Sequence, residues 1–248
     1  FDHMDFLGNS LESIGREKAG ILRPDQCVVL GPDMPKSVTQ CCDKLDLAPR
    51  IYGEDFVADS GTFSQRWNLK GDDYYIADIP LTNLAPQNIA IAFETADTIT
   101  SMKQDYLKKS SFNRHFPGRL ESLEYSGTKF VLDVAHNPPG VEFLLAQLKL
   151  RNYQVGAVVC GMLANKEHAV VWEKMETLHE LPWFVVSTEG ERSYSNKILV
   201  ENFSDSCIAV QTVEEAVSSA VKETSSIEIV LVFGSFNIVE RVGDYLAV

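Results

Sequence analysis

The sequence lacks the patterns that define several large classes of protein. It has no apolar run long enough to cross a membrane and no basic, apolar leader, so nothing in it indicates membrane insertion or secretion. It has no Gly-x-Ser-x-Gly of a hydrolase and no zinc-type Cys/His spacing. A Gly-x-Gly-x-x-Gly after a strand is also missing, which weakens a dinucleotide-binding interpretation, and there is no Gly-x-x-x-x-Gly-Lys-[Ser/Thr] phosphate loop.

Cysteine and positive charge are both scarce. The 5 cysteines are an odd number without a Cys-x-x-Cys pair, and Cys27 and Cys160 lie in apolar, strand-like runs where we expect buried thiols. This usage fits a reduced, cytoplasmic protein. The 22 Lys and Arg residues against 35 Asp and Glu give a formal net charge of −13, which argues against nucleic acid or an anionic membrane as a partner. A small anionic ligand in a local pocket remains compatible with this charge.

The most informative stretch is residues 130–140, where a strand-like apolar run ends in polar residues. Asp133, His136 and Asn137 follow this run and precede an amphipathic helix that begins near Pro138-Pro139-Gly140. In open α/β sheets, ligands bind at the edge where strands end and helices begin. Asp133 and Asn137 are equally compatible with simple capping of the next helix.

Strands and helices alternate regularly from residue 128 onward. We predict strands at 129–133, 154–160, 182–187, 206–210 and 227–233, and helices at 139–150, 166–178, 195–203, 213–224 and about 236–247. This alternation predicts an α/β domain of the Rossmann-like kind, with a mostly parallel sheet and helices on both faces. Gly161 and Gly234-Ser235 come at strand ends, where small residues either admit a ligand or make ordinary tight turns.

The preceding part of the chain is less regular. We expect a helix over 10–19, with Asn9 as its N-cap in a capping-box-like pattern with Glu12 and with Gly20 as its stop. Further expected elements are a strand at 27–31, a helix at 36–46, a β-rich region at 49–78 with a hairpin turn at Gly71-Asp72-Asp73, a helix from Pro86 to about residue 100, and a short helix and connector ending at Pro117-Gly118. A change in composition places the domain boundary near 118–128, and we divide the chain into residues 1–122 and 123–248.

Three single residues in this part have two interpretations each. Lys18, in the last turn of a helix, either complements the helix dipole or is a buried lysine near a metal. Asn88, in the first turn of an apolar helix, is either a cap or a site residue. Arg119, directly after Pro117-Gly118, is either a surface charge or reaches a phosphate across a cleft.

Five segments, in this order, resemble the folylpolyglutamate synthase and dihydrofolate synthase family of the Mur-type ligases. The first and fourth are specific when they are found together, and the fifth is weaker; they are DHMDFLGNSLESIGREKAGI (2–21), PQNIA (86–90), PGRLE (117–121), LDVAHNP (132–138) and FGSF (233–236). The resemblance covers essentially the whole chain. It implies the later part of a P-loop-type ATPase domain over residues 1–122 and a C-terminal glutamate-ligase domain over residues 123–248.

The resemblance also implies a reaction and roles. ATP phosphorylates a carboxylate of a folate to give an acyl phosphate, and the amino group of L-glutamate attacks it, with dihydropteroate as a possible second acceptor. His3 and Lys18 match Mg²⁺ ligands, and Lys18 matches a lysine that becomes carbamylated. Asn88, Arg119 and Asp133 match ATP-binding residues. His136 and Ser235 lie where the family places glutamate, and His136 and Lys18 are the expected catalytic residues.

The sequence departs from the family pattern because it contains no phosphate loop. A site without this loop lacks its main anchor for the phosphates, so we predict little or no ligase activity for the chain alone. We interpret the chain as a fragment of the ligase or as a chain whose N-terminal half is missing from this sequence. Two alternatives stay open: a cell-wall Mur ligase, and a non-catalytic module that binds nucleotide or glutamate. We expect a cytoplasmic monomer whose partners are small molecules.

Overall fold

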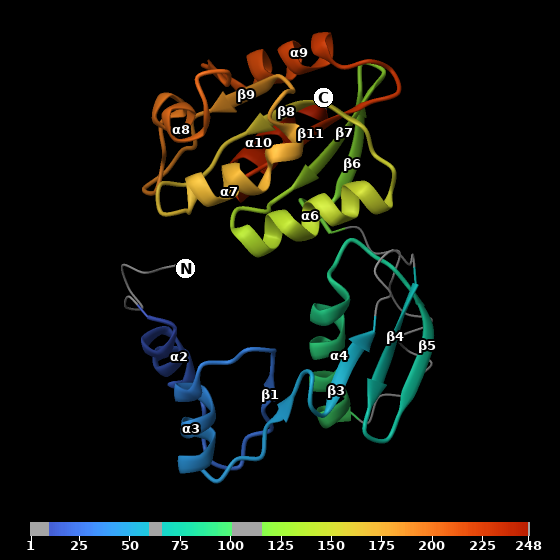
Figure 1. The fold of residues 1–248 in the computed structure, drawn as a ribbon, viewed down its shortest axis with the longest axis vertical. Coiled ribbons are helices and arrows are strands. Elements are labelled where there is room, and N and C mark those ends of the chain that lie inside the picture. Colours follow the sequence, from blue (N-terminus) through green and yellow to red (C-terminus); the bar gives the residue numbers. More distant parts are fainter. Residues whose placement is uncertain (1–9, 60–65, 101–115, 248) are drawn as a thin grey trace. The chain divides into compact units, whose positions relative to one another are not determined.

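The computed structural model describes residues 10–59, 66–100 and 116–247, which fall into two compact units. Figure 1 shows their elements. The first unit ends at Arg114 and the second runs from His115 to Val248. The boundary predicted between residues 122 and 123 falls inside a strand of the second unit, β6, Glu121–Tyr125. The observed division comes earlier because the residues just before β6 pack on the second unit, where Leu120 is buried.

The first unit contains two small sheets and three described helices. A two-stranded parallel sheet pairs β1 with β2, and a three-stranded antiparallel sheet has the order β3-β4-β5. The elements in chain order are α2 (Leu11–Ala19), β1 (Val29–Leu30), α3 (Lys36–Lys44), β2 (Arg50–Ile51), β3 (Phe56–Asp59), β4 (Arg66–Gly71), β5 (Tyr75–Pro80) and α4 (Pro86–Thr100). The predicted hairpin at Gly71-Asp72-Asp73 and the helix from Pro86 are confirmed.

The first helix differs from the prediction at its cap. Ser10, not Asn9, is the N-cap, and its side chain and that of Ser13 form the capping box. Glu12 instead accepts hydrogen bonds from the backbone of the next helix, from the Lys36 N–H at 3.1 Å and the Ser37 N–H at 2.8 Å. The capping residue and the role of Glu12 were therefore predicted wrongly, because the partner of Glu12 lies 24 to 25 residues away in the chain.

Two further predictions for this unit need correction. The strand expected over 27–31 is only β1, Val29–Leu30, and the helix expected over 36–46 ends at Lys44. Cys27 is exposed and not buried. It lies before the two residues that form the short strand β1. The prediction of a buried thiol is confirmed for Cys160.

A buried ion pair ties α4 to the rest of the first unit. Glu94 of α4 is 4% exposed, and its Oε1 accepts from the Arg50 Nε–H at 2.6 Å. Its Oε2 accepts from the Tyr74 hydroxyl, and a second guanidinium nitrogen of Arg50 binds Asp72 at 2.7 Å. Burial and the neighbouring Glu94 raise the pKa of Tyr74 well above its usual value. This network fixes β2, the β4–β5 hairpin and α4 against one another.

The second unit is a six-stranded sheet of order β10-β9-β8-β11-β7-β6, parallel except for the β6–β7 pair. Its fold class, α/β with a mostly parallel sheet, is as predicted. The remaining elements in chain order are β7 (Thr128–Asp133), α6 (Pro138–Leu150), β8 (Val155–Cys160), α7 (His168–Lys174), the 3-10 helix η1 (Glu176–Leu178), β9 (Trp183–Val186), α8 (Asn196–Phe203), β10 (Ile208–Val210), α9 (Val213–Glu223), β11 (Ile229–Phe233) and α10 (Phe236–Leu246).

Two hydrophobic cores lie on the two faces of this sheet (Figure 1). Successive strand side chains point to opposite faces. Along β11, Leu231 and Phe233 accordingly join the core under α6, α7 and α8, while Val230 and Val232 join the core under α9 and α10. Helices therefore cover both faces, as the alternation of strands and helices predicted.

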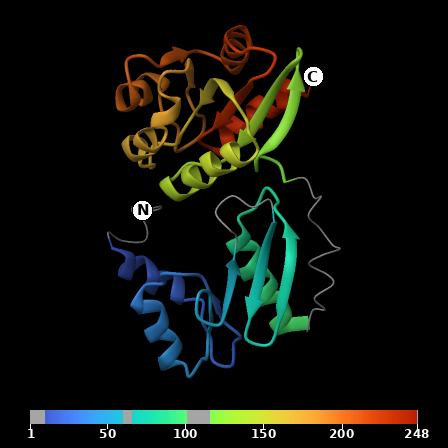
Figure 2. The same cartoon turned by 45° about the vertical axis from the view of Figure 1, so that its right-hand side comes forward.

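The edge strand β6 was not predicted. It pairs antiparallel with β7 through a two-residue turn, Ser126-Gly127, in which both residues have positive φ, +51° and +76°. Such a turn is typical of tight hairpins. The Ser126-Gly127 turn was the sequence feature that could have indicated this hairpin. The strand was not recognised because β6 is polar and is exposed at alternate positions. Figure 2 shows this hairpin at the edge of the sheet.

Candidate functional site

The candidate site lies where the parallel strands of the second unit end. Asp133, the last residue of β7, is in register with Phe233 of β11, and Phe233 is in register with Cys160 of β8. The segments that follow these three strands therefore start side by side. This edge is where ligands bind in open α/β sheets.

Asp133 is buried, with 5% of its surface exposed. Its Oδ1 accepts from the Ala135 N–H at 2.8 Å, and its Oδ2 accepts from the Leu120 N–H at 2.9 Å. Burial raises the pKa of Asp133, and the two N–H groups together with the charges of Arg119 and His136 oppose that rise. Asp133 does not cap the following helix, so this alternative is excluded.

Arg119 lies in a turn that crosses over the end of β7. The turn residues Gly118 and Leu120 have positive φ, +66° and +47°. Arg119 itself is exposed, and its guanidinium lies 5.9 Å from the centroid of the Phe236 ring, at the start of α10. Arg119 and Asp133, which are about 14 positions apart in the sequence, are thus brought together with Phe236.

His136 and Asn137 occupy the loop between β7 and α6. The Nδ1 of His136 lies 2.7 Å from the carbonyl oxygen of Val134, so this nitrogen carries the proton and donates. Asn137 is the N-cap of α6, and its side-chain oxygen accepts from the Gly140 N–H at 2.9 Å. The capping alternative is therefore confirmed for Asn137.

Ser235 is buried at the start of α10, with 2% of its surface exposed. Its hydroxyl donates to the carbonyl oxygen of Gly161 at 2.8 Å and accepts from the Ile238 N–H at 3.2 Å. The preceding Gly234 has φ +118°, and a Cβ there would lie 2.7 Å from the Gly161 oxygen. Ser235 thus joins the ends of β8 and β11 and caps α10.

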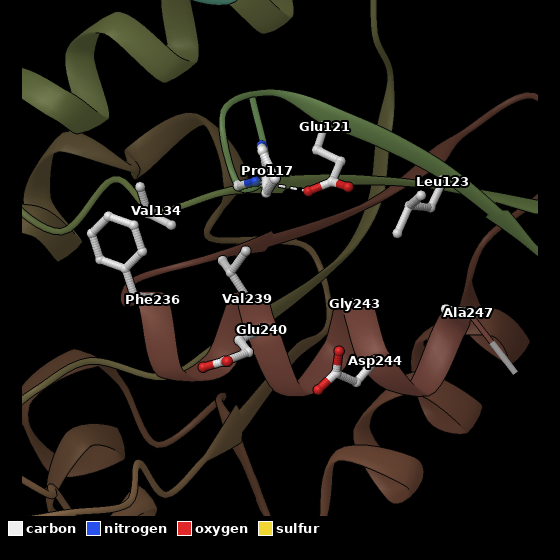
Figure 3. Close-up of a pocket in the computed structure, with 11 residues that line it drawn as sticks. Pro117, Glu121, Leu123, Val134, Phe236, Val239, Glu240, Gly243, Asp244 and Ala247 are labelled. Atoms are coloured by element: carbon white, nitrogen blue, oxygen red, sulfur yellow. Dashed lines mark hydrogen bonds between the residues drawn. The ribbon is translucent and has the colours of Figure 1, made fainter. Parts of the chain in front are cut away.

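A cavity of about 500 Å³ lies beside the Arg119 turn, between β6 and α10 (Figure 3). Its walls are largely apolar and include Leu123, Val134, Phe236 and Val239. Its charged lining residues are all acidic: Glu121, Glu240 and Asp244. Because these carboxylates repel anions, we do not assign phosphate or glutamate to this cavity.

A comparison with known protein families finds a match to the part of the chain that carries the site. The family described as Mur ligase, glutamate ligase domain, matches residues 118–236. The match runs from the Arg119 turn to the first residue of α10 and so contains Arg119, Asp133, His136 and Ser235.

The whole chain is similar to folylpolyglutamate and dihydrofolate synthases. A dihydrofolate synthase/folylpolyglutamate synthase of Haemophilus influenzae is 28% identical, over 96% of this chain and 60% of the relative. One of Escherichia coli is also 28% identical, over 99% of this chain and 58% of the relative. A crystal structure of the bifunctional enzyme from Yersinia pestis, complexed with AMPPNP and Mn ion, has 28% identity and a TM-score of 0.84 and covers 99% of this chain and 59% of that one. The chain therefore spans about 60% of the length of the curated relatives it matches.

Two residues expected near ATP or metal belong to the first unit and lie outside the matched residues 118–236. Lys18 is an exposed residue in the last turn of α2, and Asn88 is an exposed residue in the first turn of α4. His3 lies outside the described residues. Within residues 10–59, 66–100 and 116–247, no group of three or more His, Cys, Asp or Glu side chains could hold a metal ion. The described residues therefore do not fit a metal by themselves.

Sequence reasoning missed two residues that take part in the site. Leu120 supplies the N–H that binds Asp133, and Phe236 supplies the ring beneath Arg119. Both residues lie inside quoted segments, Leu120 in 117–121 and Phe236 in 233–236, but an apolar side chain suggested no role in binding. The available signal was position, since each directly follows a residue that the sequence did single out.

Proposed function

We propose that this chain is the C-terminal portion of an ATP-dependent ligase that adds L-glutamate to a folate through an acyl phosphate. The observation that carries the proposal is the gathering of Arg119, Asp133 and His136 at the end of β7, within the Mur ligase glutamate ligase domain. The similarity to enzymes named folylpolyglutamate and dihydrofolate synthases supports the folate as acceptor. Dihydropteroate as a second acceptor belongs to the same proposal.

Arg119 is the residue we propose to meet the nucleotide phosphates. It is exposed, always charged, and held by a structured turn, which suits a forked donor for phosphate oxygens. Asp133 and Asn88 belong to the same nucleotide site in this proposal. A related crystal structure is described as having Mn, AMPPNP and L-glutamate bound, at 26% identity and a TM-score of 0.86, which supports a shared nucleotide and glutamate site.

His136 and Ser235 are proposed to mark the glutamate side of the site. His136 has its Nδ1 proton held by the Val134 carbonyl, which fixes the orientation of the ring. Ser235 is committed to Gly161 and Ile238, so its part would be to hold the β8 and β11 ends in place for glutamate. His136 is the residue of this pair proposed to touch a substrate.

A divalent cation, expected to be Mg²⁺, and ATP complete the proposal. His3 and Lys18 are its expected ligands, and a carbamylated Lys18 would supply a carboxylate-like oxygen. The described residues do not fit a metal by themselves, so a complete metal site would need ligands beyond them. The setting we propose is a cytoplasmic monomer with small-molecule partners, and no helix among the described residues is long and apolar enough to span a membrane.

A titration calorimetry experiment with AMPPNP and Mn²⁺ tests the nucleotide part. We expect the chain to bind AMPPNP and the R119A variant to bind about 10-fold or more weakly, because a charged hydrogen bond contributes about 1.5–3 kcal/mol. The matched control is K222A, which removes one positive charge from the last turn of α9. Equal affinity of wild type and R119A, or an equal loss in K222A, would contradict the assignment of Arg119.

A competition experiment separates the folate ligase from a cell-wall Mur ligase. A folate, and not a nucleotide-linked muramyl substrate, is expected to alter the AMPPNP affinity of the chain. The opposite preference would move the assignment to the cell-wall branch.

A non-catalytic binding module is favoured by one observation, the missing phosphate loop in the sequence. Replacing Lys18 distinguishes this hypothesis from the ligase fragment, since a module that binds nucleotide without catalysis needs no metal-bound lysine. Loss of metal-dependent AMPPNP binding in K18A would support the ligase. Unchanged binding would support the module.

A further inference from the structure

The cavity between β6 and α10 is a part of the second unit to which the proposed function gives no role. One wall is β6, with Glu121 and Leu123, and the other is a stripe along one side of α10 (Figure 3). The residues of this α10 stripe recur at helical spacing and are Phe236, Glu240, Gly243, Asp244 and Ala247. The cavity volume of about 500 Å³ is typical of small-molecule sites, which measure about 300–1,000 Å³.

The charge of this cavity favours a cation. Glu240 and Asp244 are exposed on α10, and Glu121 lies on the opposite wall. Glu121 Oε2 accepts from the Gly118 N–H at 2.7 Å, drawn as a dashed line in Figure 3, whereas Glu240 and Asp244 have no hydrogen bond or ion pair with another described residue. No described lining residue is a lysine, arginine or histidine. The carboxylates on α10 are therefore not neutralised by the described residues.

Three features of the α10 stripe are unfavourable for the helix itself. Gly243 lies in the helix interior, where glycine is less stable than alanine. Glu240 and Asp244 are like charges four positions apart, and Asp244 lies in the last turn, where the helix dipole disfavours an acid. Packing does not require the glycine, because a Cβ on Gly243 would meet the Leu132 side chain at an ordinary 3.7 Å. A ligand in the cavity accounts for these residues better than helix stability does.

The same features suit a cation that carries an apolar chain. The side chains of Glu240 and Asp244 start about 5–6 Å apart, as positions four residues apart on a helix do, and two ammonium groups joined by a short methylene chain can span this distance. The missing side chain at Gly243 leaves room for the chain, and Leu123 and Val239 supply apolar surface. A bare metal ion does not fit, since the described residues contain no group of three or more His, Cys, Asp or Glu that could hold one.

We propose that the cavity between β6 and α10 binds a linear aliphatic polyamine. Its ammonium groups lie at Glu240 and Asp244, and its methylene groups lie over Gly243. The positive Arg119 is close to Phe236 at the other end of the α10 stripe, with 5.9 Å between its guanidinium carbon and the ring centroid, so the polyamine lies toward the C-terminal end of α10. This site is independent of the proposed function, because neither carboxylate is assigned to nucleotide, glutamate or metal.

A titration of the ¹⁵N-labelled chain with putrescine, a linear diamine, tests the site. At low ionic strength we expect saturable chemical-shift changes at the Glu240, Gly243 and Asp244 amides. Butylamine has one ammonium group in place of two and should bind about 3-fold or more weakly, since an exposed ion pair contributes about 0.2–1 kcal/mol. The inference is overturned if putrescine gives no saturable change in α10, or if the two amines bind equally well.

A charge variant and a matched control separate this site from general attraction to an acidic protein. E240Q/D244N should weaken putrescine binding about 10-fold, because it removes both carboxylates proposed to bind ammonium groups. The control E201Q/E223Q removes the same charge from exposed positions of α8 and α9 and should weaken binding less than about 2-fold. Equal losses in the two double variants would mean that the attraction is general, and would overturn the inference.

The G243L variant tests the cavity without weakening the helix. Leucine is a better helix former than glycine, so the unfolding temperature should equal or exceed that of the wild type. The leucine side chain takes the space proposed for the methylene groups, so the shifts in α10 should be absent at the putrescine concentration that saturates the wild type. Wild-type affinity in G243L would overturn the inference. If G243L is less stable than the wild type, the comparison of E240Q/D244N with its control decides.

Discussion

Buried polar side chains at the end of the parallel strands are satisfied by the backbone of the same domain. Asp133 accepts from two N–H groups, and Ser235 donates to one carbonyl and accepts from one N–H. Such groups are costly to bury without partners, so these bonds form with the fold itself. The site is therefore pre-formed in its backbone, and Arg119 and His136 are the candidate side chains left to face a ligand.

Replacement of Ser235 by alanine should reduce stability by about 1–3 kcal/mol. The variant loses an N-cap and leaves the buried Gly161 carbonyl oxygen without this donor. Urea unfolding measures the change. The control is S195A, because Ser195 is the N-cap of α8 without a side-chain capping bond, and it should change stability by less than about 0.5 kcal/mol. Equal losses in both variants would contradict this account of Ser235.

We expect the stability of the protein to depend on pH through the buried His168. It is 7% exposed, its Nε2 donates to the Leu163 carbonyl oxygen at 2.8 Å, and its ring stacks on Tyr194. Burial lowers the pKa of His168 below its usual 6.5, and the hydrogen bond to Leu163 opposes this only in part. The unfolded chain therefore binds a proton more readily than the folded one. Stability is retained above pH 6.5 and is lost as the pH falls toward the lowered pKa.

Urea unfolding at pH 7.5 and pH 5.5 tests this pH dependence. The contribution of His168 to the slope is at most about 1.4 kcal/mol per pH unit, the value for one proton. The H168Q variant cannot titrate at this position and should show a smaller loss of stability between the two pH values. A loss as large as that of the wild type would assign the pH dependence to another group.

At the scale of elements, the junction of β11 and α10 joins the two central strand ends. Gly234 turns the chain with φ +118°, and Ser235 then starts α10. The turn brings Gly234 so close to Gly161 that no side chain fits. This junction therefore requires both the positive φ of Gly234 and the absence of a Cβ at that position.

Two glycine-to-alanine variants separate those two requirements. G190A places a Cβ at φ +91° with nothing within 4 Å, so it should cost only the backbone strain, about 1 kcal/mol. G234A adds a contact of 2.7 Å with the Gly161 oxygen and should be destabilised by a further ~1 kcal/mol or more. Thermal unfolding followed by circular dichroism gives both values. Equal losses would mean that the close contact is relieved at no cost.

At the scale of the whole molecule, the two units have separate cores. The core residues on both faces of the six-stranded sheet are numbered 120 and above, and those of the first unit lie before residue 94. Each unit therefore buries its apolar surface within itself. A sheet with helices on both faces, of the length of residues 115–248, is large enough to fold as a domain by itself.

Residues 115–248 expressed alone should consequently unfold cooperatively in urea. The comparison is residues 123–248, which begin at the boundary predicted from sequence and lack Leu120, the Arg119 turn and half of β6. That shorter chain leaves Asp133 without the Leu120 N–H and should be less stable by about 2 kcal/mol or more. Equal stability of the two chains would contradict the earlier boundary.

The sequence by itself determined the α/β class, the alternating elements from residue 128 onward and the edge at which Asp133, His136 and Ser235 lie. Short apolar runs, helical spacing and glycines at strand ends are local signals, so they can be recognised without knowledge of the tertiary partners. The capping interpretation of Asn137 was available for the same reason, since its acceptor oxygen and the Gly140 N–H are three residues apart.

The tertiary structure alone decided how those residues are used. Ser10 replaces Asn9 as the cap while Glu12 binds α3, Cys27 is exposed, β6 exists through its pairing with β7, and Asp133 binds Leu120 from 13 residues away. In the contacts of Glu12 and Asp133, the partner lies 13 to 25 residues away in the chain. A hydrogen bond between such distant residues depends on where the chain folds back, and no local pattern encodes that position.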